Sequence, residues 1–94
     1  MVLINVMRFY RVSVNSDGVK IGKDSRRKAL SLVHYGDESV GMVSDKDASY
    51  DSGRELPPYM EWYSQGFDCQ SGLWLKTGSG VVEVEVEEVL SVAV

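Results

Sequence analysis

Residues 81–94 read VVEVEVEEVLSVAV. Valine and glutamate alternate strictly from Val82 to Val86. Because successive side chains of a β-strand point to opposite faces, this alternation predicts a strand with one buried face and one acidic face in water. Beyond Glu88 the two faces lose their contrast in polarity, so the last residues are expected to be buried or to turn helical.

Residues 2–14 predict a second long strand, with one apolar face made of Val2, Ile4, Val6, Tyr10, Val12 and Val14. The opposite face begins with Leu3 and Met7, and we expect this part to be covered as well. Residues 40–43 predict a short strand.

Two turns predict hairpins. Asn15-Ser16-Asp17-Gly18 follows the first long strand, and its Asp and Gly tolerate the positive φ of a tight turn, so residues 19–21 should return as its partner. Gly78-Ser79-Gly80 separates residues 73–77 from the C-terminal strand in the same way.

Two segments predict short helices. Residues 25–35 can be capped by Asp24 or Ser25, and their apolar side chains recur at helical spacing. Residues 57–67 begin with two prolines and place aromatic side chains three and four residues apart. The predicted fold is therefore a single α+β domain over residues 1–94, in which two short helices pack on an antiparallel sheet of about four or five strands.

The composition limits the classes of protein to consider. The chain has 94 residues, of which 44% are hydrophobic and 26% charged, as in ordinary globular domains. No apolar run approaches the ~20 residues that span a bilayer, so no membrane association is expected. One cysteine and one histidine exclude an internal disulfide and a four-ligand zinc site of nitrogen and sulfur. We expect a soluble, cytoplasmic protein.

Charge is distributed unevenly along the chain. Residues 1–36 carry seven basic and two acidic side chains, a net +5, whereas residues 37–94 carry three basic and twelve acidic ones, a net −9. Either the two halves neutralise each other inside the fold, or one pole of the surface meets a charged partner.

The acidic face is the first candidate partner-binding site, consisting of Glu83, Glu85, Glu87 and Glu88 together with the exposed loop acids Asp45, Asp47 and Asp51. Regularly spaced carboxylates can imitate a phosphate backbone and occupy a basic surface. The alternative is that the glutamates pair internally or keep an exposed strand from aggregating.

Two further candidates accompany it. The predicted helix start carries Lys23, Arg26, Arg27 and Lys28, which suit an anion, or else are solvated or pair with the glutamates. An aromatic anchor for a protein partner is formed by Tyr59, Trp62 and Tyr63, which can alternatively belong to the core.

The sequence predicts neither catalytic activity nor metal binding. His34 and Cys69 lie in different elements without a nucleophile motif, so we expect neither catalytic residues nor a cofactor. Residues 45–51 resemble the opening of a calcium loop, but Tyr50 stands where that loop needs glycine and Leu56 where it needs glutamate. No metal site is therefore expected.

The leading hypothesis is a non-enzymatic acidic protein that binds and inhibits another protein with a basic surface, such as one that handles nucleic acids. In size, acidity and lack of catalytic groups the chain is similar to small phage-encoded inhibitors of the anti-CRISPR type and to immunity proteins. This resemblance implies a viral protein that imitates DNA. One alternative is a nucleic-acid-binding module that uses the basic helix start, although a pI of about 4.8 opposes it. The other is a structural subunit that assembles through an exposed edge strand.

Overall fold

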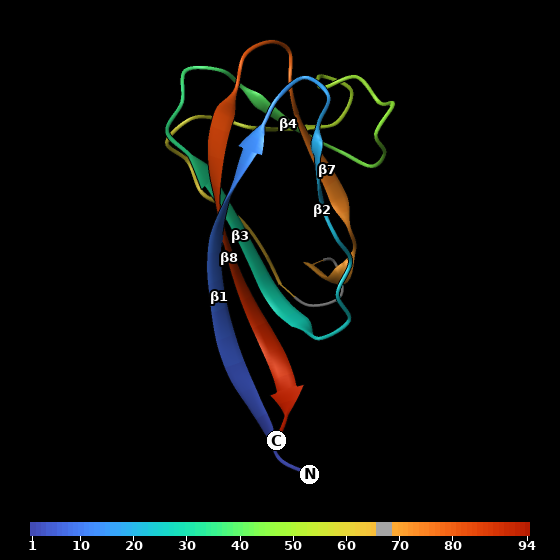
Figure 1. The fold of residues 1–94 in the computed structure, drawn as a ribbon, viewed down its shortest axis with the longest axis vertical. Coiled ribbons are helices and arrows are strands. Elements are labelled where there is room, and N and C mark those ends of the chain that lie inside the picture. Colours follow the sequence, from blue (N-terminus) through green and yellow to red (C-terminus); the bar gives the residue numbers. More distant parts are fainter. Residues whose placement is uncertain (66–68) are drawn as a thin grey trace.

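The computed structural model describes residues 1–65 and 69–94. In this part of the chain there is no α-helix, and the strands form two antiparallel sheets of four strands each that pack face to face (Figure 1). The prediction of an α+β fold with two helices is therefore wrong. The molecule is elongated, with extents of 47 × 24 × 17 Å.

The two sheets are called sheet A and sheet B. Sheet A has the order β1-β8-β3-β6, with bounds β1 Leu3–Val14, β8 Val82–Ala93, β3 Arg27–His34 and β6 Trp62–Gln65. Sheet B has the order β2-β7-β4-β5, with bounds β2 Val19–Ile21, β7 Leu73–Thr77, β4 Val40–Val43 and β5 Arg54–Leu56.

The hydrophobic core fills the space between the sheets. Its members from β8 are the even-numbered valines of the alternating segment, and they are at most 4% exposed: Val82, Val84 and Val86. Leu32 of β3, in the same sheet, and Leu75 of β7, in sheet B, belong to the same cluster. The prediction that the C-terminal alternation marks a strand with one buried face is confirmed, and the strand continues to Ala93 instead of turning helical.

Residues 27–34 form β3 and not the predicted helix. β3 lies between β8 and β6, so neighbouring strands bond its backbone on both edges. Leu30, Leu32 and His34 are fully buried on its core face. The apolar spacing that suggested a helix instead belongs to a strand that carries Ala29 and Val33 on the face opposite to Leu30 and Leu32, so apolar residues stand next to one another in the sequence. Asp24, the predicted cap, closes a turn, since its carboxylate accepts the Arg26 amide at 2.9 Å.

Residues 57–65 also contain no helix. After Pro57 and Pro58 the chain turns at Tyr59, which has a φ of 63°, and then enters β6. The turn is held to β3 because the Tyr59 amide donates to the His34 carbonyl at 2.8 Å. Phe67, the last aromatic residue of the predicted helix, lies outside the described residues.

Both predicted turns exist, but neither joins the strands of a hairpin. Gly18 adopts a φ of 92°, as the turn prediction requires. However, β1 pairs with β8 along its whole length, and β2 pairs with β7 in the other sheet. Residues 78–80 likewise lead from β7 in sheet B to β8 in sheet A. Each turn therefore connects a strand of one sheet with a strand of the other.

The first part of β1 is exposed on both faces, so the expectation that Leu3 and Met7 are covered is wrong. They are 60% and 54% exposed. β3 reaches only to Leu90 of β8. Beyond it, residues 1–5 and 91–94 continue as a two-stranded ribbon, the narrow end of the molecule that carries both termini (Figure 1). We call this segment the ribbon.

Candidate functional site

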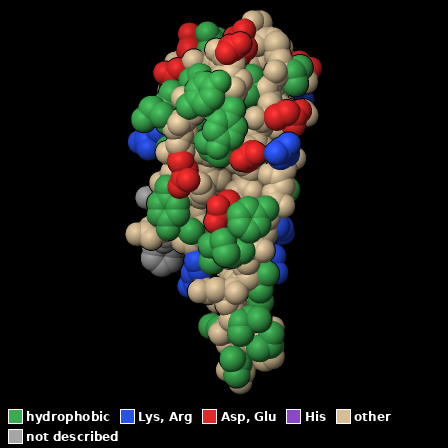
Figure 2. Space-filling model, turned by 90° about the vertical axis from the view of Figure 1, so that its left-hand side faces the viewer, with side chains coloured by type: hydrophobic (Ala, Val, Ile, Leu, Met, Phe, Trp, Pro, Cys, Tyr) green, Lys and Arg blue, Asp and Glu red, His purple; other side chains and the backbone are tan. Residues whose placement is uncertain are grey.

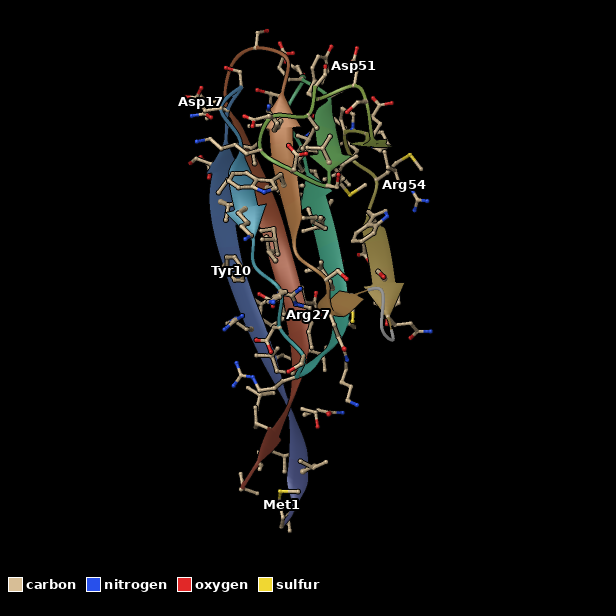
Figure 3. All side chains as sticks on the ribbon, turned by 90° about the vertical axis from the view of Figure 1, so that its right-hand side faces the viewer. Met1, Tyr10, Asp17, Arg27, Asp51 and Arg54 are labelled. Atoms are coloured by element: carbon tan, nitrogen blue, oxygen red, sulfur yellow. The ribbon has the colours of Figure 1, made fainter. Side chains whose placement is uncertain are left out.

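Two of the predicted binding residues form a buried ion pair inside the sandwich. The Arg27 Nε donates to the Glu88 carboxylate at 2.7 Å, and both side chains are at most 2% exposed. The remaining Arg27 nitrogens donate to the carbonyls of Cys69 and Gly22 at 2.8 and 2.7 Å. Arg8 donates to the other oxygen of Glu88 at 3.0 Å. Figure 3 shows Arg27 in the interior, so Arg27 and Glu88 are structural residues and cannot meet a partner directly.

Tyr10 extends this buried cluster. Its hydroxyl hydrogen-bonds to Glu88, and burial together with this carboxylate raises the pKa of Tyr10 to about 12. The Arg8 guanidinium lies 5.7 Å from the centre of its ring. Burial alone would raise the pKa of Glu88, but the hydrogen bonds from Tyr10, Arg27 and Arg8 outweigh it and hold that pKa below its ordinary value.

These two pKa shifts predict a stability plateau near neutral pH. The folded-state pKa of Glu88 is lowered, so its stabilising contribution is present above about pH 4.5 and is lost as the pH falls through that pKa. The folded-state pKa of Tyr10 is raised, so its contribution is complete below about pH 10 and is lost as the pH rises toward 12. Urea unfolding followed from pH 3 to pH 12 should show both limbs. The variant Tyr10→Phe should abolish the contribution of Tyr10 to the alkaline limb and, because Glu88 loses a hydrogen bond, move the acid limb to higher pH. An unchanged alkaline limb would contradict the assignment.

The face of sheet A turned away from sheet B carries the other three predicted glutamates, Glu83, Glu85 and Glu87. We call it the outer face. Strand register places Phe9, Glu87, Ser31 and Tyr63 in one row across β1, β8, β3 and β6. Arg11, Glu85 and Val33 form the next row. Figure 2 shows this side of the molecule, where hydrophobic side chains lie beside carboxylates.

Not all of these carboxylates are available. Glu83 accepts a hydrogen bond from Ser13, and Glu85 pairs with Arg11 at 3.1 Å in an exposed ion pair. Glu61 and Glu87 make no ion pair within residues 1–65 and 69–94. This face therefore carries four glutamates and one arginine, Arg11, and its net charge is negative. The glutamates are Glu61, Glu83, Glu85 and Glu87.

A groove of about 400 Å³ runs over the middle of the outer face. Small side chains on β3, Ser31 and Val33, leave it open above the sheet. It is also lined by Phe9, Glu61, Glu87 and the exposed ion pair of Arg11 with Glu85. Phe9 is 65% exposed and Tyr63, in the same row, is 55% exposed. The groove therefore combines exposed aromatic surface with unpaired carboxylates.

The predicted aromatic anchor is divided by the fold. Tyr63 lies on the outer face, opposite Ser31. Trp62 points the other way and packs against the core. Tyr59 is exposed beside Tyr35, with ring centroids 5.6 Å apart. Only Tyr63 of these three shares a strand row with the acidic residues.

The acidic loop is not part of this surface. The Lys76 ammonium donates to the carbonyls of Lys46 and Ala48 at 2.8 and 2.9 Å, which ties the loop over the outer side of sheet B. Asp45, Asp47 and Asp51 are exposed there. They lie across the sandwich from the outer face of sheet A, so one flat partner cannot contact both sets.

The predicted basic cluster is dispersed as well. It was placed at a helix start, and no helix exists there. Arg27 is buried, and Arg26 pairs with Asp24 at 3.0 Å. Lys23 and Lys28 are exposed. Three of the four ion pairs among the described residues join the basic first part of the chain to the acidic second part, so internal neutralisation accounts for much of the charge asymmetry.

Sequence reasoning did not select Phe9, Ser31 or Glu61. The alternation of residues 2–14 already placed Phe9 on the same strand face as Arg11, which was a usable signal. Ser31 and Glu61 carried no such signal, because both lay inside or beside segments that were assigned to helices.

The described part of the chain contains no helix long and apolar enough to cross a membrane. Residues 1–65 and 69–94 also bring together no group of three or more side chains from His, Cys, Asp and Glu that could hold a metal ion. No protein family model matches the chain, and neither a curated protein nor a solved structure is significantly similar to it.

Proposed function

We propose that this chain is a non-enzymatic protein-binding domain whose outer face engages a partner with a basic surface. The observation that carries the proposal is the groove, where Glu87 and Glu61 make no ion pair with the described residues and Phe9 exposes its ring. The exposed ring of Tyr63 lies in the same strand row. An exposed aromatic side chain beside unpaired carboxylates favours a cationic, partly apolar occupant over an anionic one.

The expected occupant is an arginine or lysine side chain of the partner. Strands lie ~4.8 Å apart, so Phe9 on β1 and Tyr63 on β6 are separated by about 14 Å across the sheet, with Glu87 and Ser31 between them. This spacing admits one long side chain lying over Ser31. Its cationic head can pair with Glu87 while its carbon stem covers the ring of Phe9.

A nucleic-acid-handling protein is the kind of partner that best fits this chemistry. Such a protein presents arginine and lysine on the surface that meets phosphate. Occupation of that surface by an acidic domain would inhibit nucleic-acid binding by competition. Inhibition then needs only the few carboxylates around the groove, since Glu88 is buried and Glu83 and Glu85 have internal partners.

The variant Glu87→Gln should weaken binding of the partner by about tenfold or more, because it leaves a basic side chain of the partner without its counter-charge. The tagged chain is used to capture proteins from nuclease-treated lysate of its source cell, and the affinity of the recovered partner is then measured at low and moderate salt. Phe9→Ser should weaken binding to a similar extent. Unchanged affinity in both variants would overturn the proposal.

Asp47→Asn supplies the matched control. It removes one negative charge, as Glu87→Gln does, but from the loop over sheet B. The proposal requires this variant to bind like the original chain. An equal loss in both variants would mean that net charge, and not the groove, drives binding. Titration with random DNA and RNA tests the nucleic-acid-binding alternative directly, and we expect no binding.

A further inference from the structure

The free edge of β1 is a second exposed feature of sheet A, and it shares only Phe9 with the groove. β1 is the terminal strand of sheet A. Val2 and Val94 exchange backbone hydrogen bonds at 3.5 and 2.9 Å, so the even-numbered residues of β1 are those bonded to β8. The backbone N–H and C=O groups of the odd-numbered residues, from Leu3 to Phe9, therefore point away from the sheet and are available to another strand.

This edge lacks the usual protection against strand pairing. Proteins generally place charged side chains, proline or a bulge on an exposed edge. Residues 1–7 contain no charged side chain and no proline, and the β1–β8 register runs without interruption from Leu3 to Val14. The first charged side chain of β1 is Arg8.

The same segment exposes a large apolar surface. Six apolar residues of β1 and its approach are between 43% and 97% exposed, namely Met1, Val2, Leu3, Ile4, Met7 and Phe9. They lie on both faces of β1, the odd-numbered residues on the outer face and the even-numbered residues on the opposite one, and exposed apolar surface of this kind marks interaction sites. Pairing of a second strand with the β1 edge would satisfy the free backbone groups and cover part of both rows of apolar side chains.

We propose that the chain forms a two-fold symmetric homodimer in which the β1 edges of two copies pair antiparallel. The favoured register is centred on Asn5, the one polar residue among residues 2–7. In this register Asn5 meets Asn5 of the partner subunit, Leu3 meets the partner's Met7, and Ile4 meets the partner's Val6. A register centred on Arg8 would instead place two like charges opposite each other, which is unfavourable.

The resulting dimer has one continuous sheet of eight strands, made from sheet A of both copies. The assembly ends at two copies, because both subunits use the same β1 edge and none is left for a third copy. Its outer faces lie on the same side, so the two grooves face the same direction. The proposal does not depend on the groove being a binding site.

Sedimentation or light scattering on the full chain tests the oligomeric state. We expect a mass of about 21 kDa, twice the 10.5 kDa of the chain, from low micromolar to near-millimolar concentration. Asn5→Pro should convert the dimer to a monomer over this range. Proline removes an N–H that points away from β8, so the β1–β8 ladder is kept and the circular dichroism spectrum should be unchanged. A monomeric original chain would overturn the proposal, and so would binding of the edge to another protein without self-association.

A cysteine cross-link tests the register without relying on a disruptive variant. Asn5→Cys places two thiols opposite each other at the symmetry axis, where oxidation should give a disulfide-linked dimer. In Phe9→Cys the two thiols would be about 27 Å apart along the strands, so no cross-link is expected. The native Cys69 is fully buried and does not compete. Equal cross-linking of both variants, or of neither, would overturn the proposed register.

Discussion

The variant Glu88→Gln should lower the free energy of unfolding by about 3–5 kcal/mol, because it leaves Arg27 charged and buried without its counter-ion. Glutamine has nearly the same shape as glutamate, so the change removes the charge without opening a cavity. Domains of this size are stable by about 5–15 kcal/mol in total. The variant should therefore be only marginally folded at room temperature.

Urea unfolding of three variants separates the charge effect from other causes. Arg8→Met removes the half-exposed partner of Glu88 and should cost about 1 kcal/mol or less, as surface ion pairs do. The double variant Arg27→Met with Glu88→Leu removes both buried charges and should be more stable than Glu88→Gln, but it should not reach the stability of the original chain because the carbonyls of Cys69 and Gly22 lose their donor. A loss of less than 1 kcal/mol in Glu88→Gln would mean that Arg27 is not held by this ion pair.

The variant Gly41→Ala should cost about 3 kcal/mol and displace the loop of residues 44–53. A Cβ atom at Gly41 would lie 1.8 Å from the Tyr50 carbonyl oxygen, which is a backbone atom and cannot rotate away. The loop would have to lift from β4, and this would weaken the hydrogen bonds from Lys76 to its carbonyls. Hydrogen exchange should accordingly accelerate in the loop, and urea unfolding reports the loss of stability.

Gly22→Ala is the matched control for this prediction. The same atom is added, but a Cβ at Gly22 meets nothing within 4 Å. The variant should be neutral or slightly stabilising, because alanine restricts the unfolded chain more than glycine does. Equal effects of the two substitutions would show that the close approach of Tyr50 to Gly41 is not the cause of the stability loss in Gly41→Ala.

Gly41→Ala also bears on the proposed function. The loop lies over sheet B, whereas the groove lies on the outer face of sheet A. A displaced loop should therefore leave binding through the groove unchanged in the fraction that remains folded. The acidic loop residues and the groove are thus separable by experiment, although the sequence had suggested one combined acidic surface.

Local patterns predicted strands reliably where one face was apolar and the other polar. The alternation from Val82 to Val86 predicted both the strand and its buried face. The same reasoning failed for residues 27–34, because Ala29 and Val33 place apolar side chains on the face opposite to Leu30 and Leu32, and the resulting spacing imitates a helix. Ser31 therefore went unnoticed, although it lies in the row that makes the groove.

The turn residues were predicted correctly, but the hairpin pairing inferred from them was wrong. Gly18 has the positive φ that its turn requires, yet the turn leads from sheet A to sheet B. A turn motif specifies the backbone angles of a few residues. Which strands then pair depends on the burial of their apolar faces, and that is a property of the whole chain.

The sequence by itself determined the elements that depend on neighbouring residues: the C-terminal strand, its acidic face, the turn at Gly18 and an excess of acidic side chains. Only the tertiary structure decided which charges remain available. Glu88 and Glu87 are adjacent in the chain, but the pleat of β8 sends one into the core against Arg27 and the other onto the outer face beside Phe9. Strand pairing brings together residues far apart in the chain, such as Arg8 and Glu88, which are 80 positions apart, and no local pattern encodes such a contact.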